Sequence, residues 1–377
     1  MCNAPLVCAR DRQDSRAMPD AAPNKDIWMT EPQWNQLLRI LAGELLDPLP
    51  VGFLADGPWM AAQLGVPLMA YFTDNGAWLE ANRHATECYP DILWLPGFWA
   101  EFGMISNPPA FGARCIWPEA GFPTCQPVLR GYDDIARLAC PNVRTDGLLP
   151  FIIQRLQCCR PAIEQAGHHI RFATAHGPLT IGAYLLGHTE FFLGMREEPA
   201  AIKQLLRTVA DFVIQWLAYQ KECFPSIEGI LVLEDLMGFV GEADFQAFVL
   251  PLMTEIFRAI DVPVRFLHND AAGLITAKYL EAMNVNLFNF SFEHDFCEIR
   301  RLAGDKVTLL GNIPPRDVLA LGTAEDVRRS VATLLERVSQ RRRMIVSAGG
   351  FVPAVFNADK IAAFCAAARA CGRGSLA

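Results

Sequence analysis

The chain has 377 residues, of which 52% are hydrophobic and 20% are charged, and its formal net charge is −8. This composition supplies enough apolar side chains for a large buried core, in one big domain or in two ordinary ones. The negative charge argues against a general nucleic-acid binder, because such proteins neutralise phosphates with a basic surface. No segment approaches the run of about 18 apolar residues that crosses a membrane.

We predict that residues 1–26 form a flexible leader. They carry charges and prolines and lack the apolar segment of a secretory signal. We therefore expect a cytoplasmic protein whose 12 cysteines are mostly reduced. No Cys-x-x-Cys occurs, so the spacing of the cysteines does not indicate a metal site with thiolate ligands.

From residue 27 onwards, an amphipathic helix at about 31–46 is followed by short apolar segments that alternate with helical ones. Apolar strands separated by helices are typical of a parallel sheet covered on both faces. Eight such units favour a (β/α)8 TIM barrel, and no Gly-x-Gly-x-x-Gly follows the first strand to support a dinucleotide-binding fold. We predict one α/β barrel domain over 27–377, with strands at Val51–Ala55, Ile92–Leu95, Ile170–Ala175, Gly229–Glu234, Val262–His268, Val285–Phe290, Val307–Leu310 and Met344–Ser347.

The segment at about 107–144 differs from this pattern. It is rich in Pro, Gly and Cys, and we interpret it as an insertion after the second strand that holds a small hairpin of its own. Long loops at a barrel mouth are more often functional than accidental.

Residues 264–271 include the end of a predicted strand that leads directly into His268, Asn269 and Asp270. In α/β barrels, the residues that end the strands share one pocket. We predict that His268 and Asp270 handle substrate or protons, and that Glu234, at the tip of the preceding strand, fixes the tautomer of His268. The alternative is a histidine that is simply buried in the core.

Other strand ends should add polar and aromatic side chains to this pocket. Asp56, Glu101 and Asp235 also lie at strand ends, without an assigned role. The histidines and carboxylates could hold a metal with mixed ligands, for which His268 is the best candidate, or the acids could simply cap helices. Aromatic residues could line a site for a flat ring or a methylated cation. The further candidates for substrate binding are Asn269, His176, Trp59, Trp99, Glu293, Asn312 and Ser347.

Several motifs resemble those of the uroporphyrinogen decarboxylase superfamily, which includes methylcobalamin:thiol methyltransferases. The resemblance covers roughly residues 30–370 and implies a single (β/α)8 barrel. The residues that carry it are Gly177-Pro178-Leu179-Thr180, Leu233-Glu234-Asp235-Leu236, Leu310-Gly311-Asn312-Ile313-Pro314-Pro315 and Ile345-Val346-Ser347-Ala348-Gly349-Gly350.

The decarboxylase branch is similar in fold but carries an arginine-rich stretch after the first strand, which pairs with the carboxylates of its substrate. Here residues 54–59 contain an acid and a tryptophan and no arginine. Burying several carboxylates without cationic partners costs several kcal/mol each. The catalytic aspartate of that branch also has no counterpart in residues 95–99. These departures argue against uroporphyrinogen as the substrate.

The methyltransferase branch holds zinc with His-x-Cys after the fifth strand and a Cys after the eighth. This chain keeps His268 but has Asp270 and Gly350 at the two cysteine positions. Without thiolates the site is a poor match for thiol-activating zinc, and whether zinc binds stays open.

The resemblance and the strand-end residues together predict a corrinoid-dependent methyltransferase. It would move a methyl group between a small molecule (a methoxy-aromatic, a methylated amine or tetrahydrofolate) and the cobalamin of a partner corrinoid protein. The alternatives are a divergent decarboxylase of a small carboxylated substrate and a binding protein without catalysis. A homodimer is a further open expectation.

Overall fold

The structure is a computed structural model that describes residues 31–119 and 121–372. The predicted leader, residues 1–26, lies outside this part of the chain. Within the described residues, no helix is both long and apolar enough to cross a membrane.

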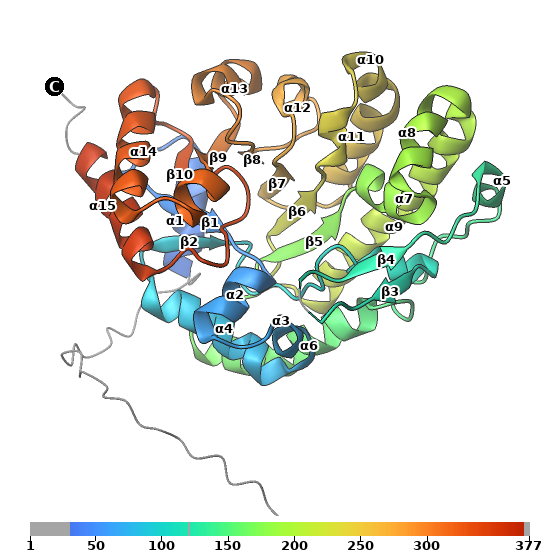
Figure 1. The fold of residues 1–377 in the computed structure, drawn as a ribbon, viewed down its shortest axis with the longest axis horizontal. Helices are drawn as coiled ribbons and strands as arrows, with labels where there is room; N and C mark the ends of the chain where they lie inside the picture. Colours follow the sequence, from blue (N-terminus) through green and yellow to red (C-terminus); the bar gives the residue numbers. More distant parts are fainter. Residues whose placement is uncertain (1–30, 120, 373–377) are drawn as a thin grey trace, which may run out of the picture.

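The centre of the molecule is a curled sheet of eight parallel strands in the order β2-β1-β10-β9-β8-β7-β6-β5 (Figure 1). Each predicted strand segment forms one of them, with ends displaced by a few residues. The curl resembles a TIM barrel, although the edge strands β2 and β5 do not pair with each other. The strands are β1 Val51–Leu54, β2 Ile92–Leu95, β5 Phe172–His176, β6 Gly229–Leu233, β7 Val264–Asn269, β8 Leu287–Phe290, β9 Thr308–Ile313 and β10 Met344–Ala348.

The sheet is apolar on both faces because side chains alternate between the barrel interior and the surrounding helices. Leu231, Phe266 and Leu310 belong to an inner cluster, whereas their neighbours along the strands pack outward. Trp34 of helix α1 (Glu31–Leu41) joins the inner cluster and meets the ring of Phe172 edge-on, at 5.6 Å between centroids. Helix α1 therefore closes the N-terminal end of the barrel.

Helices surround the outer face of the sheet (Figure 1). The longer ones follow individual strands, as a βα repeat requires. They are α2 Gly57–Leu64, α3 Leu68–Thr73, α4 Asn75–Cys88, α6 Leu149–Gln165, α7 Pro178–Leu186, α8 His188–Glu197, α9 Pro199–Cys223, α11 Leu250–Ala259, α12 Leu274–Tyr279, α13 Phe296–Ala303, α14 Ala324–Arg337 and α15 Ala358–Gly372; short turns are α5 Tyr132–Ile135 and α10 Glu242–Asp244.

The chain between β2 and β5 contains a two-stranded antiparallel sheet, β3 (Arg114–Ile116) with β4 (Thr124–Gln126). The same segment covers the free edge of β5. The Oδ1 atom of Asn107 accepts hydrogen bonds from the backbone N–H of His176 at 2.9 Å and from its ring Nδ1 at 3.0 Å. A side chain thus replaces the neighbouring strand that a closed sheet would have here.

Candidate functional site

A cavity of about 240 Å³ opens at the C-terminal ends of the strands. Its wall combines carboxyl groups and two histidines with aromatic and aliphatic side chains. Active sites of α/β barrels lie at this end, because the loops after the strands converge there. The lining residues are Asp56, Trp99, Glu101, Gly103, Met104, Phe122, His176, Thr180, Leu233, Asp235, His268, Asp270 and Phe351.

His268 is held in one orientation by Asn289 on the neighbouring strand β8. The Nδ1 atom of His268 lies 2.8 Å from Oδ1 of Asn289. The amide nitrogen of Asn289 donates to the carbonyls of Leu310 and Ala348, so its oxygen is the atom left to accept from the ring. The Nδ1 atom therefore carries a proton, and Nε2 faces the cavity.

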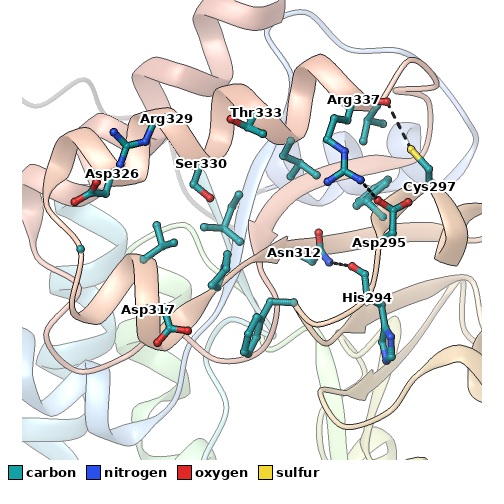
Figure 2. Close-up of a pocket in the computed structure, with 18 residues that line it drawn as sticks. His294, Asp295, Cys297, Asn312, Asp317, Asp326, Arg329, Ser330, Thr333 and Arg337 are labelled. Atoms are coloured by element: carbon teal, nitrogen blue, oxygen red, sulfur yellow. Dashed lines mark hydrogen bonds and ion pairs between the residues drawn. The ribbon is translucent and has the colours of Figure 1, made fainter.

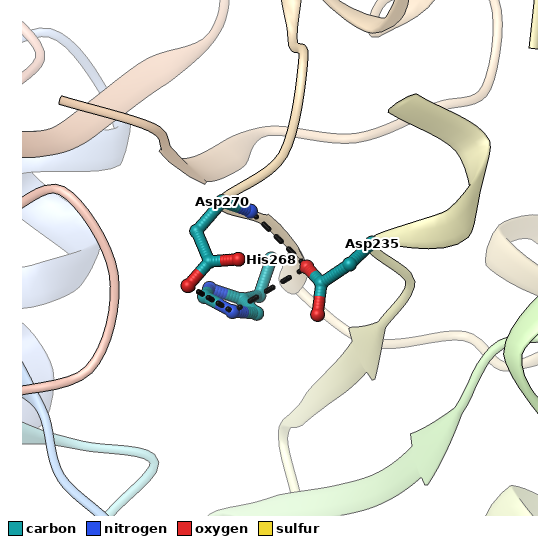
Figure 3. Close-up of side chains that lie close together, drawn as sticks. All are labelled: Asp235, His268 and Asp270. Carbon is teal, nitrogen blue, oxygen red and sulfur yellow. Dashed lines mark hydrogen bonds and ion pairs between the residues drawn. The ribbon is translucent and has the colours of Figure 1, made fainter. Parts of the chain in front are cut away.

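Two carboxylates flank this Nε2 atom (Figure 3). It lies 3.7 Å from Oδ1 of Asp235 and 3.8 Å from Oδ2 of Asp270. The ring is 1% exposed, whereas the two carboxylates are 39% and 42% exposed. Burial raises the pKa of Asp235, and the like charge of Asp270 adds to the effect. One imidazole nitrogen and two carboxylate oxygens converge here, so the arrangement can accept hydrogen bonds from a ligand or hold a cation.

The predicted contact between Glu234 and His268 is wrong. Strand β6 ends at Leu233, whose side chain points into the barrel, so Glu234 points the other way. Its carboxylate accepts from the N–H of Leu179 at 2.7 Å and from the hydroxyl of Thr180 at 2.6 Å, at the start of α7. Burial raises the pKa of Glu234 to about 7. Asp235, the next residue, occupies the position beside the histidine.

Asp56 and Glu101 form a second acidic group on the β1 and β2 side of the cavity. Glu101 accepts hydrogen bonds from the backbone N–H groups of Gly57, at 3.0 Å, and of Gly103. Burial raises the pKa of Glu101 to about 6. Burial, together with repulsion from Glu101, raises the pKa of Asp56 to about 8. Asp56 is therefore mostly protonated at neutral pH, when the cavity holds no ligand.

Two of the predicted substrate-binding residues, His176 and Trp99, do line the cavity. Burial, with a smaller effect from His268, lowers the pKa of His176 to about 4, so its ring is neutral. Because Nδ1 donates to Asn107, its Nε2 atom is free to accept a hydrogen bond.

Trp59 and Asn269 lie elsewhere, which corrects their predicted roles. Trp59 is fully buried, donates from Nε1 to the carbonyl of Phe356 and stacks on Trp94. Asn269 has the opposite strand parity to His268 and bonds Thr276 with its amide nitrogen, at 3.0 Å. Both side chains pack within the barrel and do not line this cavity.

Glu293, Asn312 and Ser347 also lie outside the cavity wall. Glu293 is exposed on the turn after β8. The amide of Asn312 donates to the carbonyls of Ser291 and His294, and the residue lines a different cavity (Figure 2). Ser347 is buried within β10, and its hydroxyl has no hydrogen-bond partner among the described residues.

The structure brings the two positions that differ from the zinc-binding pattern side by side. A Cβ atom built on Gly350 would lie 2.9 Å from Oδ2 of Asp270. The backbone of Gly350 has φ +128°, which an L-residue such as cysteine rarely adopts. His268, Asp235 and Asp270 offer ligand atoms within 4.8 Å of one another. This donor set fits a metal ion that prefers nitrogen and oxygen, and it does not fit an ion that activates thiols through thiolate ligands.

The fold and the site define a TIM-like barrel protein with a carboxylate-rich cavity at the C-terminal ends of its strands. The family model for uroporphyrinogen decarboxylase (URO-D) matches residues 33–371, and the chain belongs to this family. The match spans nearly the whole described chain, so the family assignment applies to the barrel as a unit.

Proteins similar to this chain carry different names. The chain is 23% identical over 337 residues to a uroporphyrinogen decarboxylase of Hydrogenovibrio crunogenus, which covers 83% of this chain and 90% of that protein. A uroporphyrinogen decarboxylase of Proteus mirabilis is 25% identical over 332 residues, covering 81% and 87%. A solved methyltransferase from Methanosarcina mazei superimposes with a TM-score of 0.74 at 15% identity, covering 88% of this chain and 97% of that one. The structural likeness shows the fold, and the site residues must decide the chemistry.

Proposed function

We propose that this protein is a methyltransferase that moves a methyl group between a small molecule and the cobalamin of a corrinoid protein. The observation that carries the proposal is the cavity wall, which combines an oriented histidine and several carboxyl groups with aromatic side chains. Among the residues that line it there is no Lys or Arg. The donor or acceptor classes are a methoxy-aromatic, a methylated amine or tetrahydrofolate.

The same wall argues against uroporphyrinogen as the substrate. A substrate with several carboxylates would be placed against Asp56, Glu101, Asp235 and Asp270. Like charges in a partly desolvated site repel strongly, and no cation among the lining residues would compensate. The decarboxylases that resemble this chain therefore share its barrel, and we infer a different reaction.

The cobalamin of a partner would supply the cobalt that takes up or releases the methyl group. The residues of this chain would position the small molecule and manage protons. Asp56 holds a proton at neutral pH, since its pKa is about 8, and can give it to an oxygen that loses a methyl group. Trp99, Phe122 and Phe351 would keep water away from the reacting atoms.

His268, Asp235 and Asp270 would be the ligands if a divalent metal binds. Such an ion would polarise a substrate oxygen, without the thiolate chemistry of the zinc sites described above. Elemental analysis of the purified protein tests this point. Stoichiometric metal that is lost in His268→Ala would support the ligand set, and metal retained in that variant would contradict it.

The test of the proposed function is spectroscopic. Protein is mixed with a corrinoid protein in the Co(I) state and with one donor of each class, and the cobalt absorbance is followed. We expect at least one donor to methylate the cobalt, and we expect His268→Ala to slow the reaction at least ~100-fold, as loss of an acid–base group does. Thr333→Ala, in the other cavity, is the matched control.

No change of the cobalt spectrum with any donor, or an unchanged rate in His268→Ala, would overturn the assignment. Release of CO2 from a small carboxylated substrate without a corrinoid requirement would favour a decarboxylase instead.

A further inference from the structure

The wall of the candidate cavity is both acidic and aromatic. Four of its 13 lining residues are Asp or Glu, and none is Lys or Arg. Trp99, Phe122 and Phe351 supply ring faces, and Met104 adds a thioether. Ring faces carry partial negative charge, so the apolar part of the wall attracts cations as the carboxylates do.

Neither Asp56 nor Glu101 forms an ion pair among the described residues, and the charge of Arg155 lowers the pKa of Glu101 by less than burial raises it. Oδ1 of Asp56 is buried without a hydrogen-bond partner in the described chain. The neighbouring cation, Arg155, instead donates to Oδ1 of Asn75 at 3.0 Å and to the carbonyl of Phe72 at 2.5 Å. A buried carboxyl oxygen without a hydrogen-bond partner is unfavourable, and a cationic ligand would provide the missing interaction.

The acids lie in two groups along the cavity. Asp56 and Glu101 form one group, and Asp235 and Asp270 form the other, beside Nε2 of His268. The volume of about 240 Å³ is below the usual range for drug-sized ligands. Tetrahydrofolate is too large for this space, and its carboxylates would meet the acidic wall.

We propose that the cavity selects a small methylated ammonium compound, with the charged nitrogen held among these carboxylates and aromatic rings. This inference rests on the proposed methyl transfer and narrows it to one donor class. In the transfer, the C–N bond breaks and its electron pair stays on nitrogen, which leaves as a neutral amine. The electron pair of the partner's reduced cobalt forms the new bond to the methyl carbon. No proton is required, in contrast to a methoxy donor.

Binding to the full chain, measured by titration calorimetry, tests the donor class without the partner protein. The probes are choline, its uncharged carbon isostere 3,3-dimethylbutan-1-ol, tetramethylammonium and 4-methoxybenzoate. We expect choline or tetramethylammonium to bind at least tenfold more tightly than the isostere, and 4-methoxybenzoate to bind more weakly than either cation. Equal binding of choline and its isostere, tighter binding of 4-methoxybenzoate, or no binding of either cation would overturn the inference.

Variants that each remove one carboxylate charge test whether the cavity carboxylates attract the cation. Glu101→Gln and Asp270→Asn each remove one cavity charge, and Asp317→Asn removes one charge at the other cavity, where Asp317 pairs with Arg316. We expect cation affinity to fall at least fivefold in the first two variants and to stay unchanged in the third. An equal loss in all three would show that the net charge of the protein, rather than this cavity, attracts the cation, and would overturn the inference.

The proposed donor class and the proposed methyl transfer can be contradicted independently of each other. Charge-selective binding without methylation of any corrinoid would leave the donor site standing and remove the proposed function. Methylation from a methoxy-aromatic, with no binding of the cations, would leave the function standing and remove the ammonium site.

Discussion

Two cavities of this protein differ in how their charges are arranged. The larger, about 550 Å³, lies between α13, β9 and α14, and its acids are paired with arginines: Asp295 with Arg337 and Asp326 with Arg329 (Figure 2). The smaller, at the strand ends, holds four carboxyl groups and has no Lys or Arg among its lining residues. Carboxyl groups without a Lys or Arg beside them, rather than a large volume, therefore mark the candidate site, because buried ionisable groups with shifted pKa values cluster at functional sites.

The largest expected effect comes from His268. Its replacement by Ala should lower kcat/KM for methyl transfer about 100-fold, since the ring is held by Asn289 and packs between the two carboxylates that would position the donor, and a misplaced reactant costs about that much. Arg329→Ala removes a charge partner in the larger cavity and should stay within about twofold of the wild type. Steady-state kinetics checks both. An equal loss of kcat/KM in the two variants would show that the strand-end cavity is no more important for activity than the larger one.

Asn289 should matter next, although it does not line the cavity. In Asn289→Ala, Nδ1 of His268 loses its acceptor and the carbonyls of Leu310 and Ala348 lose their donor. We expect a loss of about 1–3 kcal/mol in the free energy of unfolding. We also expect a shifted pH profile of kcat, because the tautomer of the ring is no longer fixed. An unchanged pH profile would show that Asn289 has a structural role alone.

Asp56 should make the protein less stable as the pH rises. Its pKa in the folded protein is about 8, above the ordinary value of 3.8, so the folded state holds a proton that the unfolded chain releases. The stabilisation is complete below about pH 4 and is lost as the pH rises through 8. In Asp56→Asn, the fall in the free energy of unfolding from pH 5 to pH 8 should be smaller by at least about 1.4 kcal/mol, the equivalent of one pKa unit.

Urea unfolding at several pH values measures this slope. Asp317→Asn serves as the control, because Arg316 lowers the pKa of Asp317 and places its titration below this window. Equal slopes in wild type and Asp56→Asn would contradict a protonated Asp56 in the folded protein.

The smallest effect on ligand binding should come from Glu234. Glu234→Gln weakens the hydrogen bonds to Leu179 and Thr180 and should cost about 1–2 kcal/mol of stability, as loss of a helix cap does. Its carboxylate does not line the cavity, so the Kd for choline should change less than twofold. Thermal unfolding and calorimetry separate the two readouts. A large change in the Kd for choline at unchanged stability would show that Glu234 takes part in ligand binding.

The strands were predictable because burial on both faces leaves a strong apolar signal. Within the site, parity along each strand was the useful guide. Phe266 points inward, so His268 and Asp270 follow it into the cavity, while Asn269 turns away. The same count from Leu231 and Leu233 selects Asp235 over Glu234, and this signal was present in the sequence.

Other parts of the site depend on contacts between residues far apart in the chain. Asn289 reaches His268 across 21 positions, and Glu101 reaches Gly57 across 44. Phe122 comes to the wall from the turn between β3 and β4, where it lies against Gly103. No local sequence pattern predicts these contacts, because they depend on how the long segment after β2 folds.

The unpaired edge of β5 has a consequence for engineering. Where a closed barrel would place a strand, Asn107 and its loop complete the wall, and Glu101, Met104 and Phe122 come from this segment and the hairpin. Residues on a loop can be exchanged without breaking a ladder of backbone hydrogen bonds. Libraries that vary Met104 and Phe122 should therefore reshape ligand preference at little cost in expression yield, whereas changes on β7 should not be tolerated as well.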